Sequence, residues 1–358
     1  MKCTIQNIAD HLGLSRNTVS KALKNSSEVS ENTRNLVIKT ASKLGYKNAT
    51  FATPVIPASE TGSNGTILFL TRTYASDSEF WTTVLRGIES ILSSANYHLA
   101  ISIMSDSDLK QLNFPQTISD SSIKGIILVE ICDKVVCDAL SQFNLPIVSV
   151  DMPNVPFEEL NGIDVVTMES KKNLKKIINQ LIEKGAESFG FVGDLYSPNV
   201  SRGFQERYNA LSECLAEHQL PLNQKNCLLH QTPEDFRNFQ TTVNNLQAMI
   251  SLPDVFICGN DWTAIQLIYA LQFLGFQIPK DICVVGFDNI PAASRISPSL
   301  TTISTPQKYL GIAAARQILE RIQHPNCPHV FCQYETELII RNSTNICLLY
   351  TSPSPRDV

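Results

Sequence analysis

The chain of 358 residues contains no run of about 18 consecutive apolar residues, the length that a membrane-spanning helix needs. Its opening stretch, MKCTIQNIADHLG, lacks the apolar core and the small-residue cleavage site of a secretory signal. The ten cysteines are scattered irregularly, which favours reduced thiols over a disulfide framework. We therefore expect a cytoplasmic protein with no membrane partner.

Several enzyme motifs are also absent. There is no G-x-G-x-x-G fingerprint, no Walker A phosphate loop and no nucleophile elbow. We therefore expect no cofactor, no catalytic residues and no enzyme. One stretch, HPNCPHVFC, holds zinc-type side chains at His324, Cys327, His329 and Cys332. Their spacing does not match the common finger patterns, so we expect no metal site.

Basic side chains are few overall and unevenly placed. The whole chain has a formal net charge of -5. Residues 1–50 hold eight basic and three acidic side chains, a net charge of +5, which leaves a net charge of −10 for the rest. A basic front end on an acidic body is typical of a nucleic-acid anchor carried by a domain that does not itself bind DNA.

Three short helices are predicted at the front of the chain. Thr4, Ser15 and Ser30 are suitable N-cap residues, and Gly13 and Gly45 end the first and third helices. Three helices with glycine in the first turn make a helix-turn-helix unit. Apolar residues at helical spacing would form its small core: Ile5, Ile8, Ala9, Leu12, Val19, Ala22, Leu23, Leu36, Val37, Ala41 and Leu44.

In a helix-turn-helix unit the second helix enters the major groove, and its first residues meet base edges. Arg16 and Asn17 occupy that place, where arginine suits guanine and asparagine suits adenine. The other predicted DNA-binding residues suit the phosphate backbone or cap the helices: Thr4, Ser15, Thr18, Ser20, Lys21, Lys24 and Asn32. The alternative is a three-helix protein-binding module with a solvated basic face.

The front segment, TIQNIADHLGLSRNTVSKALKNSSEVSENTRNLVIKTASKLGY, resembles the headpiece of the lactose/galactose repressor (LacI/GalR) family. The resemblance is carried by TVS after the two reading residues, by VSENTR before the third helix and by the closing LGY. It implies a sequence-specific transcriptional regulator, with repression as the expected outcome. It also implies a homodimer that places two headpieces on a pseudo-palindromic double-stranded DNA operator.

The linker, residues 48–65, departs from the family pattern. Relatives usually form a short hinge helix here, with a leucine that wedges into the minor groove. Val55 falls at the wedge position, but Pro54 precedes it and Pro57 follows, and proline disrupts a helix interior. Two interpretations stay open: an apolar side chain still inserts between base steps, or the segment is a passive tether.

Short β-branched runs alternate with helical stretches after the linker, which predicts parallel sheets with helices on both faces. After Asn161 the rhythm restarts, which indicates two similar lobes. Ligands of such sheets bind beyond the carboxyl ends of the strands. The predicted strands are TILFL, HLAISIM, GIILVEI, PIVSVD, IDVVTM, FGFVG, VFICGND and ICVVGFDN.

Polar and aromatic residues follow these strands, in the combination that binds sugars through hydroxyl groups and ring faces. For any one of them the alternative is a strand-end cap or a core aromatic. The predicted ligand-binding residues are Phe80, Trp81, Asp151, Arg207, Asn260, Asp261, Trp262 and Asp288.

The family resemblance extends over the body through PDVFICGND, IPKDICVVGFDN, SPSLTTI and LIIRNST. It implies an α/β, two-lobed, periplasmic-binding-protein-like effector domain. It also implies that Asp261 and Arg207 contact the ligand. Asp151 and one aromatic of the Phe80–Trp81 pair are expected to lie nearby. The Gly-Tyr pair that follows this arginine in relatives is replaced by Ala210-Leu211.

We divide the chain into a helix-turn-helix domain (1–47), a linker (48–65), a ligand-binding and dimerisation domain (66–346) and a tail (347–358). The tail reads CLLYTSPSPRDV and resembles a translated sequencing-library adapter, so it is left out of the fold prediction. The predicted function is a DNA-binding regulator controlled by a small molecule, expected to be a sugar. The alternatives are a solute-binding protein with an N-terminal extension, which needs an export signal, and a sugar-acting enzyme.

Overall fold

The computed structural model divides into two compact units, Met1–Gly62 and Ser63–Val358. The boundary between them falls inside the predicted linker. Predicted features at residues 48–62, at Lys24, at Asn32 and in the tail 347–358 lie outside the described residues. The structure describes residues 4–23, 29–30, 33, 36–37, 40–41, 63–72, 78–195, 201–230 and 238–345.

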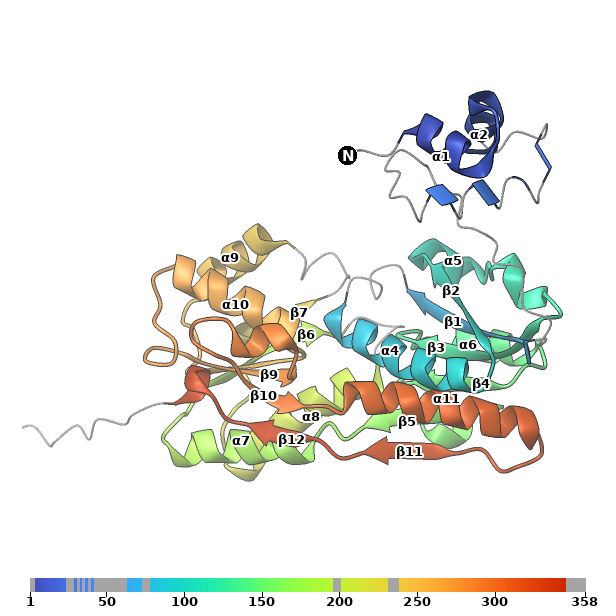
Figure 1. The fold of residues 1–358 in the computed structure, drawn as a ribbon. Helices are drawn as coiled ribbons and strands as arrows, with labels where there is room; N and C mark the ends of the chain where they lie inside the picture. Colours follow the sequence, from blue (N-terminus) through green and yellow to red (C-terminus); the bar gives the residue numbers. More distant parts are fainter. Residues whose placement is uncertain are drawn as a thin grey trace, which may run out of the picture. The chain divides into compact units, whose positions relative to one another are not determined.

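The first unit begins with two short helices, α1 (Ile5–Leu12) and α2 (Arg16–Leu23). The predicted caps are confirmed: Thr4 accepts from the backbone N–H of Asn7, and Ser15 accepts from that of Thr18. Gly13 closes α1 in the left-handed region, with φ of 63°. These local signals place the tight turn where the sequence predicts it (Figure 1).

A small apolar core holds the first unit together. A third helical segment contributes to it, and Ser30 accepts from the backbone N–H of Thr33 at its start. One prediction was wrong: Leu36 was expected to face inward, but it is 50% exposed, because neighbouring Val37 takes the inward position. The buried residues are Ile8, Ala9, Val19, Ala22, Val29, Val37 and Ala41.

The second unit contains two six-stranded sheets, each forming one lobe. The first-lobe sheet has the order β11-β5-β4-β3-β1-β2, and all its pairs are parallel. Its strands are β1 (Thr66–Arg72), β2 (His98–Met104), β3 (Ile123–Val129), β4 (Ile147–Val150), β5 (Ile163–Met168) and β11 (Phe331–Tyr334). Its helices are α4 (Glu79–Ser94), α5 (Asp106–Gln111), α6 (Lys134–Ser141) and α11 (Gln307–Gln323).

The second-lobe sheet has the order β12-β10-β9-β8-β6-β7, and only the described pair β10–β12 is antiparallel. Its strands are β6 (Phe189–Asp194), β7 (Leu228–His230), β8 (Val255–Cys258), β9 (Cys283–Asp288), β10 (Thr301–Ser304) and β12 (Glu337–Ile339). Its helices are α7 (Lys172–Glu183), α8 (Arg202–Glu217), α9 (Phe239–Ala248) and α10 (Asp261–Phe273). Short 3-10 turns are η2 (Gln116–Ser119), η3 (Phe157–Glu159), η4 (Gln224–Asn226), η5 (Pro291–Ser294) and η6 (Asn342–Thr344).

The chain passes between the lobes three times: from β5 to α7, from β10 to α11, and from β11 to β12. This corrects the prediction that the second lobe starts after Asn161. The segment IDVVTM is β5, which pairs with β4 and β11 and therefore belongs to the first lobe. Strand rhythm along the chain does not reveal which sheet a strand joins, because pairing partners lie far apart in sequence.

Helix α11 returns to the first lobe and packs closely on α4 (Figure 1). A Cβ at Gly311 would lie 2.0 Å from the carbonyl oxygen of Val84, and one at Gly87 would lie 2.2 Å from that of Lys308. Glycine at these two positions therefore lets the helix backbones approach. No helix in the described ranges is long and apolar enough to cross a membrane.

Candidate functional site

The outer face of α2 is the first part of the candidate site. Arg16 and Asn17, in the first turn, are exposed, while Val19 and Ala22 are buried on the opposite face. Ser20 and Lys21 lie one turn after the two exposed residues, on the same outward side. The helix thus presents the two predicted base-reading side chains together.

The remaining predicted DNA-binding residues are placed in different ways. Thr4 is exposed but has a capping role, since its hydroxyl and its backbone N–H both bond to Asn7. The Ser15 hydroxyl caps α2 and also bonds to the Thr18 hydroxyl at 2.8 Å. Their contact with DNA stays a prediction.

Charged residues stand at the carboxyl ends of the first-lobe strands. Arg72 ends β1, Glu130 follows β3 and Asp151 follows β4. Glu130 and Asp151 both have a left-handed backbone, with φ of 56° and 72°. This conformation is unfavourable for residues other than glycine, and such strain is concentrated at functional sites.

The second lobe contributes Asp194 at the end of β6 and Asp288 at the end of β9, where φ is 115°. Arg207 reaches the same region from α8 and is only 3% exposed. Its Nη1 donates to the carbonyl of Gly259 at 2.6 Å, and its guanidinium lies over the Phe287 ring, 3.6 Å from the centroid. Arg207 is therefore held in one position by its own lobe.

Asp151 of the first lobe and Arg207 of the second converge beside Gly203. A Cβ at Gly203 would lie 3.4 Å from Asp151 Oδ2, 3.4 Å from Arg207 Nη2 and 3.5 Å from Ser170 Oγ. The lobes also touch here through the backbone, where the Arg202 N–H donates to the Met152 carbonyl at 2.9 Å. The structure thus brings together polar groups of both lobes that are far apart in sequence.

The carboxyl groups of this region carry strongly shifted pKa values. Burial raises the pKa of Glu130 to about 7, although Trp81 and Arg72 act to lower it and Asp194 and Asp151 add to the rise. Burial also raises the pKa of Asp151, and that of Asp288 to well above its ordinary value, while Arg207 opposes both shifts. These carboxyl groups are therefore buried and close enough together to disfavour their ionised forms.

Replacing Glu130 with glutamine is expected to raise the free energy of unfolding at pH 8, with little change at pH 5. In the folded protein the pKa of the Glu130 carboxyl group is about 7, whereas in the unfolded chain it has its ordinary, lower value. The folded protein therefore binds the carboxyl proton more tightly, and the contribution of Glu130 to the free energy of unfolding falls as the pH rises from the ordinary pKa through about 7. The gain at pH 8 is up to about 3 kcal/mol. Urea unfolding at both pH values measures it, and an equal change at pH 5 and pH 8 contradicts the assignment.

The predicted aromatic pair lies at the start of α4. The Trp81 side chain lies close to the Glu130 carboxyl group and acts to lower its pKa. Phe80 packs edge-on against Trp81, with ring centroids 4.5 Å apart, and both side chains are buried. Trp81 therefore lies beside the cluster of charged groups described above, while Phe80 packs against the Trp81 ring. We call this cluster the carboxylate region; its members are Arg72, Glu130, Asp151, Asp194, Arg207 and Asp288.

The predicted residues of α10 are placed differently. Asn260 caps the helix, since its Oδ1 accepts from the backbone N–H of Thr263 at 2.8 Å. Asp261 is completely buried, and its two oxygens accept from the Thr302 hydroxyl at 2.5 Å and the Ile290 N–H at 2.9 Å. Trp262 is 41% exposed. Ligand contact by these three residues stays a prediction.

Four residues in or beside the carboxylate region are not among the predicted ligand-binding residues: Arg72, Glu130, Asp194 and Ser170. Glu130 stands inside the apolar run GIILVEI, and a lone acid at the end of such a run was the available signal. Ser170 lies between β5 and α7, where the chain passes from one lobe to the other, and no local pattern marks it.

The zinc-type residues do not gather. His329 Nδ1 lies 3.2 Å from Asp164, while His324 Nε2 lies 3.8 Å from Glu320. In the described ranges no group of three or more His, Cys, Asp or Glu side chains could hold a metal ion.

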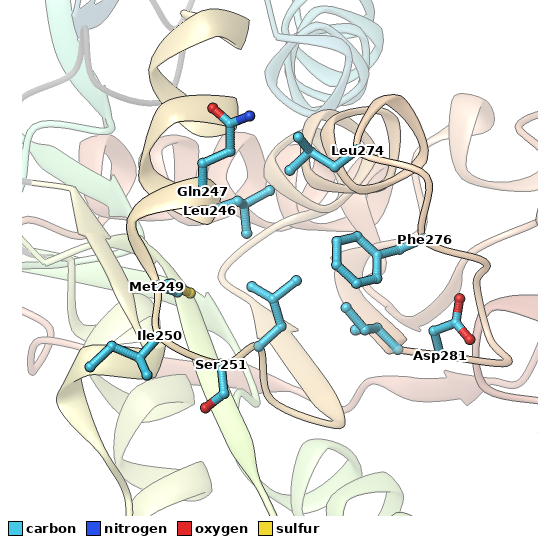
Figure 2. Close-up of a pocket in the computed structure, with 10 residues that line it drawn as sticks. Leu246, Gln247, Met249, Ile250, Ser251, Leu274, Phe276 and Asp281 are labelled. Atoms are coloured by element: carbon cyan, nitrogen blue, oxygen red, sulfur yellow. The ribbon is translucent and has the colours of Figure 1, made fainter.

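A hollow of about 470 Å³ lies elsewhere on the second lobe (Figure 2). Leu252 precedes β8, and Asp281 and Ile282 precede β9, so the hollow is at the amino ends of these strands. The hollow therefore lies at the opposite end of the strands from Asp288, which ends β9, and it is separate from the candidate site. Its other lining residues are Leu246, Gln247, Met249, Ile250, Ser251, Leu274 and Phe276.

Two family models match the chain. The model of bacterial regulatory proteins of the lacI family matches residues 4–48, and that of the periplasmic binding protein-like domain matches residues 178–344. The first therefore covers α1 and α2, and the second covers most of the second lobe. Together they confirm the predicted combination of a DNA-binding headpiece and an effector-type domain.

Full-length relatives have the same organisation. The chain is 27% identical to the ribose operon repressor of Haemophilus influenzae over 344 residues, covering 95% of this chain and 98% of that one. It is 26% identical to the HTH-type transcriptional repressor PurR of Photobacterium profundum over 345 residues, covering 95% and 98%. Both relatives are named as repressors and not as enzymes.

The fold is shared with a solved structure, that of the lac repressor dimer bound to operator and an anti-inducer. The TM-score is 0.65 at 20% identity, and the match covers 96% of this chain and 99% of that one. The family models, the full-length relatives and the fold agree with the headpiece and the two lobes described above. The chain therefore combines a headpiece similar to that of bacterial regulatory proteins of the lacI family with a periplasmic binding protein-like domain.

Proposed function

We propose that this protein is a transcriptional repressor whose affinity for operator DNA is controlled by a small molecule. The observation that carries the proposal is the outer face of α2, where Arg16 and Asn17 are exposed in the first turn above a buried core. Arginine and asparagine are suited to the edges of guanine and adenine in the major groove. The same helix start attracts phosphate through its backbone N–H groups.

The reading and anchoring roles are separable by mutation. Asn17→Ala is expected to relax base preference at one position of each half-site, because it removes a bidentate contact of about 1–3 kcal/mol. Lys21→Ala, one turn further along α2, is expected to weaken binding equally on all sequences and to reduce the salt dependence. Fluorescence anisotropy on operator and scrambled duplexes at several salt concentrations distinguishes them. Identical effects of both variants on every duplex contradict the assignment.

The proposed effector site is the carboxylate region where the lobes meet. Asp151, Arg207 and Asp288 supply fixed hydrogen-bonding groups, and Trp81 supplies an aromatic surface. This combination suits a sugar, since charged and amide groups bind hydroxyls and aromatic rings pack on the carbon face. The name of the ribose operon repressor, a full-length relative, supports a sugar effector.

Control of DNA binding would pass through the lobes. Asp151 and Arg207 come from different lobes, so a ligand that bonds to both stabilises one relative position of the lobes. Among the described residues, three segments join the lobes: those from β5 to α7, from β10 to α11 and from β11 to β12. A ligand with unequal affinity for two lobe arrangements shifts their populations, which couples effector binding to DNA binding.

The assembly proposed for this mechanism is a homodimer that acts in the cytoplasm. Two headpieces read two half-sites of a pseudo-palindrome, and two-fold symmetry of the protein matches that of the DNA. The lac repressor structure that shares this fold is a dimer bound to its operator.

A further inference from the structure

Arg207 is a buried arginine that forms no ion pair with any described residue, and it is only 3% exposed. Arg321, at 5% exposed, shows the usual arrangement, since its Nη2 lies 2.7 Å from a carboxylate oxygen of Asp164. Burial lowers the pKa of Arg207, and the charges of Asp288 and Asp151 oppose that shift only in part. Arginine stays protonated in proteins, so its positive charge is buried without a directly bound counter-charge.

One edge of the Arg207 guanidinium also lacks hydrogen bonds. Nη1 donates to the carbonyl of Gly259 at 2.6 Å. Nε is buried without a partner among the described residues, and none of these residues accepts from Nη2. The N–H groups of Nε and Nη2 point in parallel from one edge of the planar group, and such a fork binds an acceptor with two oxygens. The unfilled edge of Arg207 is therefore a binding fork.

The protein fixes the orientation of this fork. The guanidinium carbon of Arg207 lies 3.6 Å from the centroid of the Phe287 ring and 5.0 Å from that of the Phe204 ring. Together with the bond to Gly259, these contacts hold the planar group in place. A ligand therefore meets two donors that are already oriented, which reduces the entropy lost on binding.

The fork lies beside a second donor without a partner, the hydroxyl of Ser170. Arg207 Nη2 lies 3.4 Å, and Ser170 Oγ 3.5 Å, from the point where a side chain would begin at Gly203. Ser170 is only 1% exposed, and its hydroxyl has no partner among the described residues. Asp151 Oδ2 borders the same point, but burial raises the pKa of Asp151 and so disfavours the charged form that would pair with Arg207.

These groups distinguish several kinds of sugar. The hydroxyls of a neutral sugar can accept from the fork, but they leave the buried positive charge unpaired. A sugar carboxylate accepts through two oxygens and pairs that charge, which strengthens the hydrogen bonds. A sugar phosphate also pairs the charge, but its own charge of about −1.5 to −2 exceeds that of one arginine.

We propose that the effector is a sugar acid, and that its carboxylate is bound side-on by Nε and Nη2 of Arg207. The Ser170 hydroxyl donates to the same carboxylate. This inference rests on the proposed function and names the ligand class of the same site. Because Arg207 belongs to the second lobe and Asp151 to the first, a ligand on the fork lies where the lobes meet.

The test compares matched sugars on the full chain by isothermal titration at one pH. Glucuronate, galacturonate and mannuronate are each compared with the parent hexose and with its 6-phosphate. At least one uronate is expected to bind at least about 10-fold more tightly than its parent hexose and its parent's 6-phosphate. Equal or tighter binding of the hexose or the phosphate in every set overturns the proposal, and so does the failure of all three uronates to bind.

Variants locate the carboxylate. Arg207→Lys keeps the positive charge but removes the fork, and it is expected to weaken binding of the preferred uronate at least about 10-fold. Ser170→Ala removes only a hydroxyl and is expected to weaken it about 5-fold. Arg202→Lys, on the same helix but in a partly exposed ion pair with Glu206, is the control and is expected to leave the affinity unchanged. Unchanged uronate affinity in both test variants contradicts the proposed contact.

The same titrations separate this inference from the proposed function. If a neutral sugar or a sugar phosphate binds best and alters operator affinity, the regulatory function stands and the sugar acid is wrong. If the protein binds no DNA sequence selectively, the function itself is wrong, whichever sugar binds.

Discussion

Replacing Asp164 with alanine is expected to lower the free energy of unfolding by about 3–5 kcal/mol, because it removes one partner of a buried ion pair. Asp164 lies in β5 and is completely buried. Its two oxygens accept from Arg321 Nε at 3.0 Å and Nη2 at 2.7 Å, and from the backbone N–H of Val330 at 2.8 Å. Without the carboxylate, the buried guanidinium of Arg321 in α11 has no counter-charge from β5.

The same change is expected to loosen the segment between α11 and β11. Arg321 also donates to the carbonyls of Pro325, Cys327 and Pro328, so one guanidinium orders the HPNCPHVFC stretch. Urea unfolding measures the loss. Glu335→Ala, which removes an exposed ion pair with Lys172, is the control and is expected to change stability by less than about 1 kcal/mol. Similar small effects of both changes contradict this account.

Replacing Arg207 with methionine is expected to weaken effector binding by at least about 100-fold, or about 2.7 kcal/mol, while operator binding without effector is kept. Burial lowers the pKa of Arg207 and the charges of Asp288 and Asp151 oppose that shift, while contacts with Gly259 and Phe287 fix its guanidinium. Methionine fills much of the same volume but cannot donate hydrogen bonds. The loss therefore reports the missing guanidinium more than a cavity.

Arg202→Met is the matched control, because Arg202 lies on the same helix but forms a partly exposed ion pair with Glu206. Titration with the sugar that binds the unmodified protein measures effector affinity, and fluorescence anisotropy measures operator affinity. Circular dichroism checks that both variants are folded. Retention of the effector response in Arg207→Met, or its equal loss in both variants, removes Arg207 from the site.

Local signals were sufficient for the headpiece. Thr4, Gly13 and Ser15 act through contacts within four residues along the chain, so their roles could be predicted from short patterns. Leu36 was misplaced because Leu36 and Val37 are both apolar, and helical spacing alone did not decide which of them faces the core.

Tertiary pairing explains what the sequence could not predict in the body. The alternation of strands and helices is local, whereas β5 and α11 join the first lobe through contacts with segments far away along the chain. The pair Asp164–Arg321 is one such contact, with partners 157 residues apart.

Part of the candidate site could be predicted from local patterns, and the part that depends on contacts between distant segments could not. Asp151 follows an apolar strand and Asp288 ends one, and that position indicated both of them. Ser170 acquires its place only when the two lobes are assembled around Gly203. Asp261 also follows a strand, but its carboxylate is turned into its own lobe toward Thr302.

The most direct test of the central claim is selection of bound sequences from random double-stranded DNA by the full chain. The account predicts enrichment of an inverted repeat whose half-sites lie about one helical turn, roughly 10 base pairs, apart. It also predicts that the Arg16→Ala, Asn17→Ala double variant loses this enrichment, since both exposed reading side chains of α2 are removed. Enrichment of no sequence, or of the same sequence by the double variant, contradicts the claim that this protein reads DNA through that helix.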